Sequence, residues 1–361
     1  MERACYTRVM AIPSQMLAGV YRGPGDVRPE LVPTPAAGPG EVLVAVSVCG
    51  VCGTDLKKIA LGLQPPPRIF GHETVGRIAA LGDGVSGWRV GQRVALYHHI
   101  PCGVCHYCRR GVPSQCPVYK RTGITAGFEP AGGGYAGFVR VMDWIVAGGG
   151  LVAVPDGVSD AAASFVEPVN TCLKAAARAD LRPGDTAWVI GAGPIGLLLA
   201  QAARLAGARV VSSDPLPGRR SLAVQLGVEA ALEPAQAPAA VSDLSEGRGA
   251  DAVFLAVPHA ALVRDALASC RPGGRVVLFA QTRFDDPLTL DAGQLGVLDK
   301  IILGAYSSDF DLNEAAAAAV FGGAIQVEPL VTHRFPLARI AEALALASRP
   351  SDGALKVLVE P

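Results

Sequence analysis

Residues 189–196, VIGAGPIG, decide the fold of the second half of the chain. Gly191, Gly193 and Gly196 have the spacing G-x-G-x-x-G, between the apolar run TAWVI (186–190) and an apolar helical pattern. In this context the first glycine makes a tight turn, the second lets the backbone approach a pyrophosphate, and the third lets the helix pack closely on the sheet. The stretch therefore predicts a strand, a dinucleotide-binding loop and a helix.

The next expected strand, RVVSSD (209–214), ends in an acidic residue. Asp214 follows the glycines at about the separation at which a carboxylate binds the ribose hydroxyls of NAD. Together with Pro194 and Ile195 of the loop, it completes the expected cofactor-binding set. FAD is the alternative, but the glycine loop of FAD proteins usually lies near the start of the chain, whereas this one follows a complete domain.

The same region predicts a preference for NAD over NADP. A 2′-phosphate beside Asp214 would place like charges together, at a cost on the order of 1–3 kcal/mol. Arg219 and Arg220 lie five and six residues further on. We expect them in the first turn of the next helix as solvated side chains, although arginine is also a common partner of a 2′-phosphate.

The rest of the chain divides at about residue 160. Before it, short alternating runs such as 41–48, 73–81 and 93–99 predict a β-rich domain. After it, helical pieces interrupted at Pro168 lead into strands that alternate with helices of ten to fifteen residues. That alternation predicts a parallel sheet covered on both faces, so the fold class is α/β.

Composition excludes several classes of protein. The 361 residues are enough for two domains, and 32 basic residues balance 32 acidic ones, which argues against a nucleic-acid partner. The longest apolar stretch, 187–207, is interrupted by Gln201 and Arg204 and is read as a strand and a helix, not as a membrane span. Residues 1–16 carry no signal-peptide pattern, so we expect a cytoplasmic protein whose clustered cysteines bind metal.

Four of the nine cysteines are clustered between residues 98 and 120. Cys102, Cys105, Cys108 and Cys116 have the spacing C-x2-C-x2-C-x7-C, which suits a closed tetrahedral shell around a structural zinc. An iron–sulfur cluster is the alternative, because it also uses four thiolates. His106 lies inside this lobe, and we expect it to be a solvated side chain.

The sequence contains several further motifs. In order along the chain they are CGVCGTD (49–55), GHE (71–73), the cysteine lobe, FVEP (165–168), GAGPIG and the final LKVLVEP. In this the chain resembles, over nearly its whole length, the zinc-dependent medium-chain dehydrogenases, which include the alcohol, polyol and threonine dehydrogenases. The resemblance implies a GroES-like β-rich catalytic domain at 1–168 and a Rossmann doubly wound parallel-sheet domain at 169–304. It also implies that a C-terminal segment, 305–361, completes the catalytic domain.

The resemblance also implies a catalytic zinc, and hence two zinc ions per chain. Cys52, His72 and Glu167 match its ligands, and Glu73 matches a carboxylate that either exchanges with water as a ligand or supports the site from outside. The alcohol-dehydrogenase branch has cysteine where this chain has Glu167. Asp55 matches the partner that fixes the tautomer of the histidine ligand.

Further positions match parts of the reaction. Thr54 resembles the hydroxyl that takes the alcohol proton, and Thr171 a contact at the nicotinamide. Lys356 matches a basic residue near the pyrophosphate, with a solvated lysine as the alternative. Lys57 occupies the position where relatives often carry the relay histidine, so it either ends the relay or binds the cofactor. His99 matches a substrate-side histidine of threonine dehydrogenases.

The expected function is therefore hydride transfer from a secondary alcohol, of polyol or sugar-like type, to NAD. L-threonine 3-dehydrogenase is the alternative within enzymes, and a non-catalytic zinc- and dinucleotide-binding sensor is the alternative outside them. The expected partners are a small-molecule alcohol and further copies of the chain, in a homodimer or homotetramer, without nucleic acid or membrane.

Overall fold

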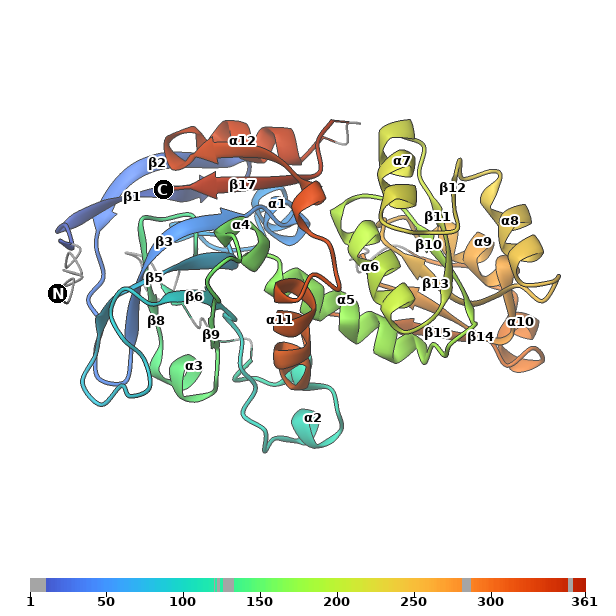
Figure 1. The fold of residues 1–361 in the computed structure, drawn as a ribbon, viewed down its shortest axis with the longest axis horizontal. Coiled ribbons are helices and arrows are strands. Elements are labelled where there is room, and N and C mark those ends of the chain that lie inside the picture. The colour runs from blue at the N-terminus through green and yellow to red at the C-terminus, as the bar shows by residue number, and fades with distance from the viewer. Residues whose placement is uncertain (1–10, 120, 122–123, 126–132, 281–286, 350–352) are drawn as a thin grey trace, which may run out of the picture. The chain divides into compact units, whose positions relative to one another are not determined.

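The computed structural model describes residues 11–119, 121, 124–125, 133–280, 287–349 and 353–361 (Figure 1). The first residues, on which the expectation of no export signal rests in part, lie outside this range. The described chain forms two compact units. The first holds residues up to Glu167, the segment that begins at Val331, and Lys356–Pro361, and the second holds Pro168–Leu330 and the few residues before Lys356.

The first unit is the predicted β-rich domain. Its larger sheet has the order β16-β17-β3-β5-β6-β9, with β8 paired to β3 and β7 to β8, and its smaller sheet has the order β2-β1-β4. The strands are β1 (Gln15–Gly23), β2 (Asp26–Pro33), β3 (Val42–Gly50), β4 (Arg68–Ile69), β5 (Glu73–Leu81), β6 (Arg93–Leu96), β7 (Ile124–Thr125), β8 (Phe138–Val141), β9 (Leu151–Ala153), β16 (Val331–Pro336) and β17 (Lys356–Glu360).

Short helices connect these strands. They are α1 (Gly53–Ala60), α2 (His106–Arg109), η1 (Pro113–Gln115), α3 (Asp143–Ala147), α4 (Asp160–Ala163), η4 (Leu337–Arg339) and α12 (Ile340–Ala347). The strand β3 is almost wholly buried, since β5 and β8 both pair with it and its run of valines packs inward. Because β17 pairs with the end of β3, it lies beside the start of α1, where Cys52 is found.

The second unit contains the predicted parallel sheet, in the order β12-β11-β10-β13-β14-β15 with every neighbouring pair parallel. Its strands are β10 (Thr186–Ile190), β11 (Arg209–Ser213), β12 (Ala230–Leu232), β13 (Ala250–Leu255), β14 (Cys270–Leu278) and β15 (Ile301–Gly304). This order is that of a doubly wound dinucleotide-binding sheet. The expected α/β fold class, with a Rossmann sheet in one domain and a GroES-like fold in the other, is confirmed.

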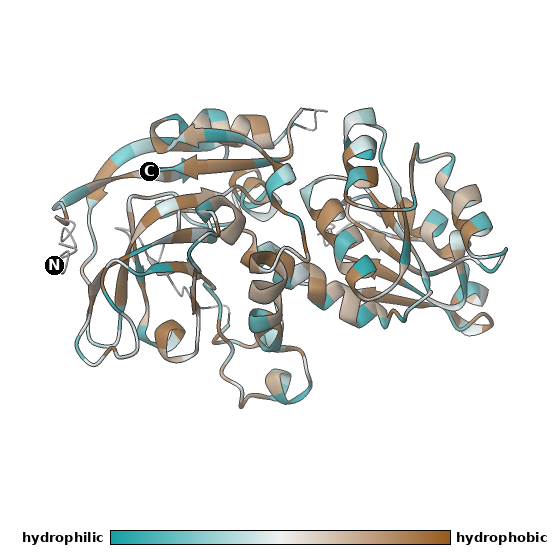
Figure 2. Ribbon diagram, in the orientation of Figure 1, coloured by the Kyte–Doolittle hydropathy of each residue, from teal (hydrophilic) through white to brown (hydrophobic). Residues whose placement is uncertain are grey.

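Helices cover both faces of this sheet (Figure 1). The helices that contact the sheet are α6 (Pro194–Leu205), α7 (Pro217–Gln225), α8 (Ala237–Leu244) and α9 (Leu262–Ser269). The remaining helices of this part of the chain are α5 (Val166–Ala179), α10 (Ala292–Gly296), η2 (Phe310–Leu312), α11 (Asn313–Phe321) and η3 (Glu328–Leu330). On one face, α8 and α9 pack on Trp188, Val211 and Val253. Figure 2 shows the sheet as hydrophobic and the helices as mixed. Each such buried side chain contributes roughly 1.5–3 kcal/mol to the stability of the sheet.

The structure places two features differently from the sequence-based expectation. The helical break falls at Ser164 and Phe165, and Pro168 lies in the first turn of α5. A proline is tolerated there because the first N–H groups of a helix have no acceptor within it.

Residues 305–330 were expected in the C-terminal segment of the catalytic domain, but they cluster with the second unit. Polar side chains of α5 and α6 hold them there. Lys174 donates to the carbonyls of Tyr306 (2.9 Å) and Ser308 (3.3 Å). Gln201 makes two hydrogen bonds to the backbone of Gln326, of 2.7 and 3.0 Å. Among the described residues, no helix is both long and apolar enough to span a membrane.

Candidate active site and metal centres

Cys52 lies where β3 gives way to α1. It is the N-cap residue of the helix, and its Sγ accepts a hydrogen bond from the backbone N–H of Thr54 at 3.5 Å. Cysteine binds metal through its sulfur, as the thiolate. Thr54 and Lys57 lie on α1, three residues apart and therefore on one face, and both are half-buried.

The second predicted ligand, His72, is held by Asp55 from α1. Oδ2 of Asp55 lies 3.1 Å from Nδ1 of His72 and also accepts hydrogen bonds from the N–H of Gly71 (3.1 Å) and the hydroxyl of Tyr135 (3.3 Å). Burial alone would raise the pKa of Asp55, but the charge and hydrogen bond of His72 outweigh it and lower that pKa. Because Nδ1 carries its proton toward Asp55, Nε2 keeps its lone pair for a metal.

Glu73 completes a set of possible ligands. Cys52, His72 and Glu73 each offer one ligand atom, and these three atoms lie within 4.8 Å of one another. Glu73 is 1 % exposed, and its Oε1 has no hydrogen-bond partner within the part of the chain that the structure describes. A buried carboxylate oxygen beside a thiol and an imidazole nitrogen suits Zn²⁺, so these residues fit the predicted catalytic zinc.

Glu167 approaches this set from the first turn of α5. It is not a member of the close group, but it is buried and lies near enough to be influenced by the charges around it. Burial first, and then the negative charge of Glu73, raise the pKa of Glu167 to about 7, while His72 and Lys356 act in the opposite direction. The structure thus gives Glu73 the closer position and Glu167 the outer one.

Lys356 is the first residue of β17, and its side chain is buried in the first unit. Its Nζ forms an ion pair with Oε2 of Glu73, lies 3.3 Å from the carbonyl oxygen of Val51 and stands 5.5 Å from the ring centre of Phe165. The resemblance implied a position near the cofactor pyrophosphate or, alternatively, a solvated lysine. The structure instead places this ammonium against the carboxylate of a metal-site residue.

Two further histidines follow β6. The ring centres of His72 and His98 are 5.0 Å apart, those of His98 and His99 are 3.9 Å apart, and Tyr119 follows at 4.7 Å. Burial lowers the pKa of His99 to about 3 and that of His98 well below its usual range, so both imidazoles are neutral. Sequence reasoning selected His99 and missed His98, although adjacent histidines after a strand were a usable signal.

The four-cysteine lobe is assembled as predicted. One sulfur each from Cys102, Cys105, Cys108 and Cys116 lie within 4.8 Å of one another. The Cys105–Cys108 sulfurs are 3.5 Å apart and those of Cys102 and Cys116 are 3.6 Å apart. Burial acts to raise the pKa of Cys116, but backbone N–H groups, including that of Cys102, bring it down to about 6. His106 is exposed, as expected.

Among the described residues, three further cysteines do not join either metal group. Cys49, Cys172 and Cys270 are buried, and burial raises the pKa of Cys49 to about 12 and that of Cys270 to about 11. Cys5 lies outside the described residues. Cys49, Cys172 and Cys270 are therefore small buried side chains.

The glycine loop lies between β10 and α6. Gly191 has φ +97°, and a Cβ on Gly196 would lie 1.7 Å from the carbonyl oxygen of Gly191, so neither position admits a side chain without a shift. Gly193 is the N-cap of α6, and Pro194 and Ile195 form its first turn. The N-terminus of α6 therefore presents free N–H groups of the kind that bind phosphate.

Asp214 directly follows β11, and both of its carboxylate oxygens bind backbone. Oδ2 accepts from the N–H of Ala192 (2.8 Å) and Oδ1 from that of Leu216 (2.9 Å). Arg219 was expected to be solvated, but only 13 % of its side chain is exposed and its Nη1 lies 3.8 Å from Asp214 Oδ2. Arg220 donates to the carbonyls of Asp214 and Pro215. Both arginines thus fold back on the strand end.

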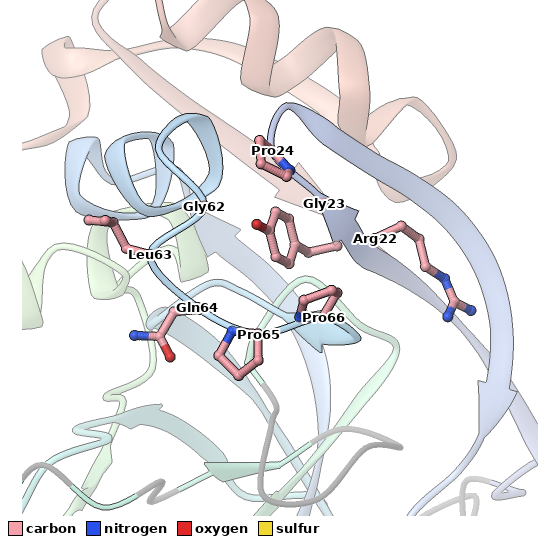
Figure 3. Close-up of a pocket in the computed structure, with 9 residues that line it drawn as sticks. Arg22, Gly23, Pro24, Gly62, Leu63, Gln64, Pro65 and Pro66 are labelled. Atoms are coloured by element: carbon pink, nitrogen blue, oxygen red, sulfur yellow. The ribbon is translucent and has the colours of Figure 1, made fainter.

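Thr171, the predicted nicotinamide contact, lies on α5 in the second unit, where its hydroxyl donates to the carbonyl of Pro168 at 2.8 Å. A separate hollow of about 440 Å³ lies in the first unit, between the β1–β2 turn and the loop after α1. Figure 3 shows Arg22, Pro24, Leu63 and Pro66 around it. Its lining includes no predicted site residue.

Comparison with known proteins agrees with this geometry. Residues 38–152 match the family described as the alcohol dehydrogenase GroES-like domain, and residues 194–320 match the zinc-binding dehydrogenase family. A sorbitol dehydrogenase of Bombyx mori is 30 % identical over 354 residues, which cover 95 % of this chain and 97 % of that protein. The chain belongs to the zinc-dependent medium-chain dehydrogenase family.

Other members are comparably similar. An L-threonine 3-dehydrogenase of Chelativorans sp. (strain BNC1) is 31 % identical over 315 residues, covering 84 % of this chain and 87 % of that protein. The cobalt- and zinc-bound thermostable alcohol dehydrogenase of Pyrobaculum aerophilum superimposes with a TM-score of 0.82 at 26 % identity, covering 96 % of this chain and all of that one. This medium-chain dehydrogenase is accordingly a zinc-dependent, NAD-linked oxidoreductase that acts on alcohols.

Proposed function

We propose that this dehydrogenase oxidises a secondary alcohol of polyol or sugar-like type at a centre held by Cys52, His72, Glu73 and Glu167. The observation that carries the proposal is the close grouping of the first three side chains, with Nδ1 of His72 committed to Asp55. Zinc bound there supplies a Lewis acid that lowers the pKa of the alcohol, and NAD takes the hydride at C4 of its nicotinamide. The products are a ketone, NADH and one proton.

The residues of α1 would carry that proton away. Thr54 lies two residues after the helix cap Cys52, and Lys57 lies on the same face one turn later. We assign the first transfer to Thr54 and the second to Lys57, in place of the histidine found in relatives. The alternative role of Lys57, at the cofactor ribose or phosphate, predicts a raised KM for NAD and an unchanged pH profile in Lys57→Met.

The two neutral imidazoles support a substrate that carries several hydroxyl groups. His98 and His99 stand beside His72, and within the described chain their Nδ1 atoms have no hydrogen-bond partner. A neutral imidazole both donates and accepts hydrogen bonds, which suits hydroxyl groups next to the one that reacts. L-threonine remains the second candidate, because His99 matches a histidine of threonine dehydrogenases and one relative with that activity is 31 % identical.

A substrate screen tests this proposal. Secondary alcohols, polyols, sugars and L-threonine are each supplied with NAD, and NADH formation and zinc content are measured for the wild type and for Cys52→Ser. We expect a polyol or sugar-like alcohol to give the highest kcat/KM, with two zinc ions per chain and little turnover in Cys52→Ser. L-threonine as the best substrate would favour the second candidate, and one zinc without turnover would favour a non-catalytic binding protein.

We also propose that the enzyme is a cytoplasmic homodimer or homotetramer. The strand β15 forms an edge of the parallel sheet, and apolar side chains near it are exposed, with Val297 at 81 % and Ile301 at 44 %. An exposed apolar strand edge favours pairing with a second copy of the chain.

A further inference from the structure

The metal centre brings several negative charges into one buried place. Cys52, Glu73, Glu167 and, through His72, Asp55 bring four side chains that can carry negative charge around one position, against the two positive charges of a zinc ion. Uncompensated charge in a buried site is costly. An excess of negative charge around a metal also weakens its ability to acidify a bound alcohol.

Lys356 supplies a compensating charge from a distant part of the sequence. Its side chain is buried, and its ammonium contacts Glu73, the carbonyl oxygen of Val51 and the face of Phe165. The pairing of β17 with β3, through Leu358 and Gly50, fixes the backbone of this segment. A buried lysine is stable only with such partners, so these three contacts define one position for the ammonium.

Gly50 fixes the other side of the pair. A Cβ at this position would lie 1.9 Å from Oε2 of Glu73 and 3.0 Å from Cε of Lys356. Its φ is not in the left-handed region, so the backbone itself would accept alanine. The missing side chain therefore provides the space in which the carboxylate of Glu73 meets the ammonium of Lys356.

We propose that Lys356 and Gly50 are positioning residues for the catalytic metal. Lys356 binds Oε2 of Glu73, Gly50 leaves room for that contact, and Oε1 remains available as a metal ligand. The ammonium also returns one positive charge to the centre. This inference rests on the metal ligands proposed above, and it differs from the pyrophosphate role that the family resemblance implies for Lys356.

The test compares Lys356→Met, Lys356→Arg and Gly50→Ala with the wild type. Lys300→Met is the matched control, because Lys300 is also buried but its ammonium binds Leu267 and Gln294 in the other unit. Release of Zn²⁺ to a chelator gives the affinity of each metal site, the absorption spectrum with Co²⁺ reports ligand geometry, and titration calorimetry gives the Kd of NAD.

We expect Lys356→Met and Gly50→Ala to weaken the catalytic metal site by about 10–100-fold and to change the Co²⁺ spectrum. The Kd of NAD should change by less than about twofold. This is a small change in binding free energy, because a tenfold change in Kd corresponds to about 1.4 kcal/mol. Lys356→Arg should retain most of the metal affinity. Lys300→Met should lower the thermal stability and leave the metal affinity and spectrum unchanged.

Other outcomes overturn the proposal. If Lys356→Met kept wild-type metal affinity and instead lost NAD affinity, Lys356 would serve the cofactor. If Lys356→Met failed to fold, Gly50→Ala would decide, and wild-type metal affinity in that variant would refute the positioning role. Failure of the proposed catalytic centre would give a different result from failure of the positioning role. In that case the wild type and Cys52→Ser would release the same amount of zinc, because Cys52 would not hold a metal ion.

Discussion

At the scale of single residues, the structure assigns Asp55 and Asp214 to the positioning of other groups. Asp55 accepts three hydrogen bonds and fixes the tautomer of His72, and Asp214 joins the glycine loop to the turn after β11. Sequence analysis identified both acids. It did not show that Asp214 accepts hydrogen bonds from two backbone N–H groups, because these groups approach the carboxylate only in the folded loop.

Substitution of Asp214 should therefore have two effects. In Asp214→Ser, the loss of two backbone hydrogen bonds loosens the glycine loop and raises the KM for both cofactors. The loss of the carboxylate also removes repulsion toward a 2′-phosphate, so the preference for NAD should fall by roughly 5–150-fold, as expected from about 1–3 kcal/mol. Values of kcat/KM with NAD and NADP measure both effects.

Arg219 provides the control for this prediction. Its guanidinium lies beside Asp214 and near the position of a Cβ on Gly193. In the double variant Asp214→Ser, Arg219→Ala, the gain with NADP should disappear. A wild-type enzyme that prefers NADP would contradict the role assigned to Asp214. It would indicate that Arg219 binds the 2′-phosphate on the adenosine half of the cofactor.

At the scale of elements, the lobe around α2 differs from the rest of the fold. Its helices α2 and η1 contain four and three residues, and most side chains between residues 103 and 113 are exposed. Such short elements have no apolar core of their own, so the four sulfurs are the main feature that can hold them together.

Cys105→Ser should consequently lower the thermal stability by several degrees and release one zinc ion per chain, because metal binding at such a lobe contributes to folding. Cys52→Ser, the comparison at the other centre, should lose turnover while the melting temperature changes much less. Circular dichroism melts with zinc analysis measure this difference. Equal melting temperatures for Cys105→Ser and the wild type would show that zinc bound in the lobe does not stabilise the fold.

The elements themselves were mostly predictable. Periodicity located β3, β5, β10 and β11 to within a few residues, because alternating or continuous apolar runs leave few other choices. The expected break between the helices at Pro168 lies instead at Ser164 and Phe165. The sequence did not predict this, because proline is compatible with the first turn of a helix and nothing in the sequence shows where that turn begins.

At the scale of the whole molecule, the sequence predicted the two domains and both metal groups but not the partner of Glu73. The ligand spacings lie within short motifs, whereas Lys356 reaches Glu73 only because β17 pairs with β3. The clustering of residues 305–330 with the second unit likewise depends on hydrogen bonds from α5 and α6. Long-range pairing of this kind leaves no local signal in a single sequence.

Assembly is the last property at this scale. If β15 is the contact between copies, Ile301→Lys should shift the enzyme toward a smaller species in sedimentation velocity, since a charge on an edge strand opposes pairing. Leu31→Lys is the control, because Leu31 is 68 % exposed on β2, an edge strand of the smaller sheet in the first unit. A change in size with Leu31→Lys alone would place the interface elsewhere.

The position of Lys356 also has a consequence for synthesis of the protein. The ribosome makes Cys52, His72 and Glu73 long before it makes Lys356, the lysine that pairs with Glu73. A nascent chain that captured zinc early would hold it with an incomplete set of neighbours. If Lys356 positions Glu73 as proposed above, the centre would reach its final form only after β17 has been made and has paired with β3, so metal loading would follow synthesis of that strand.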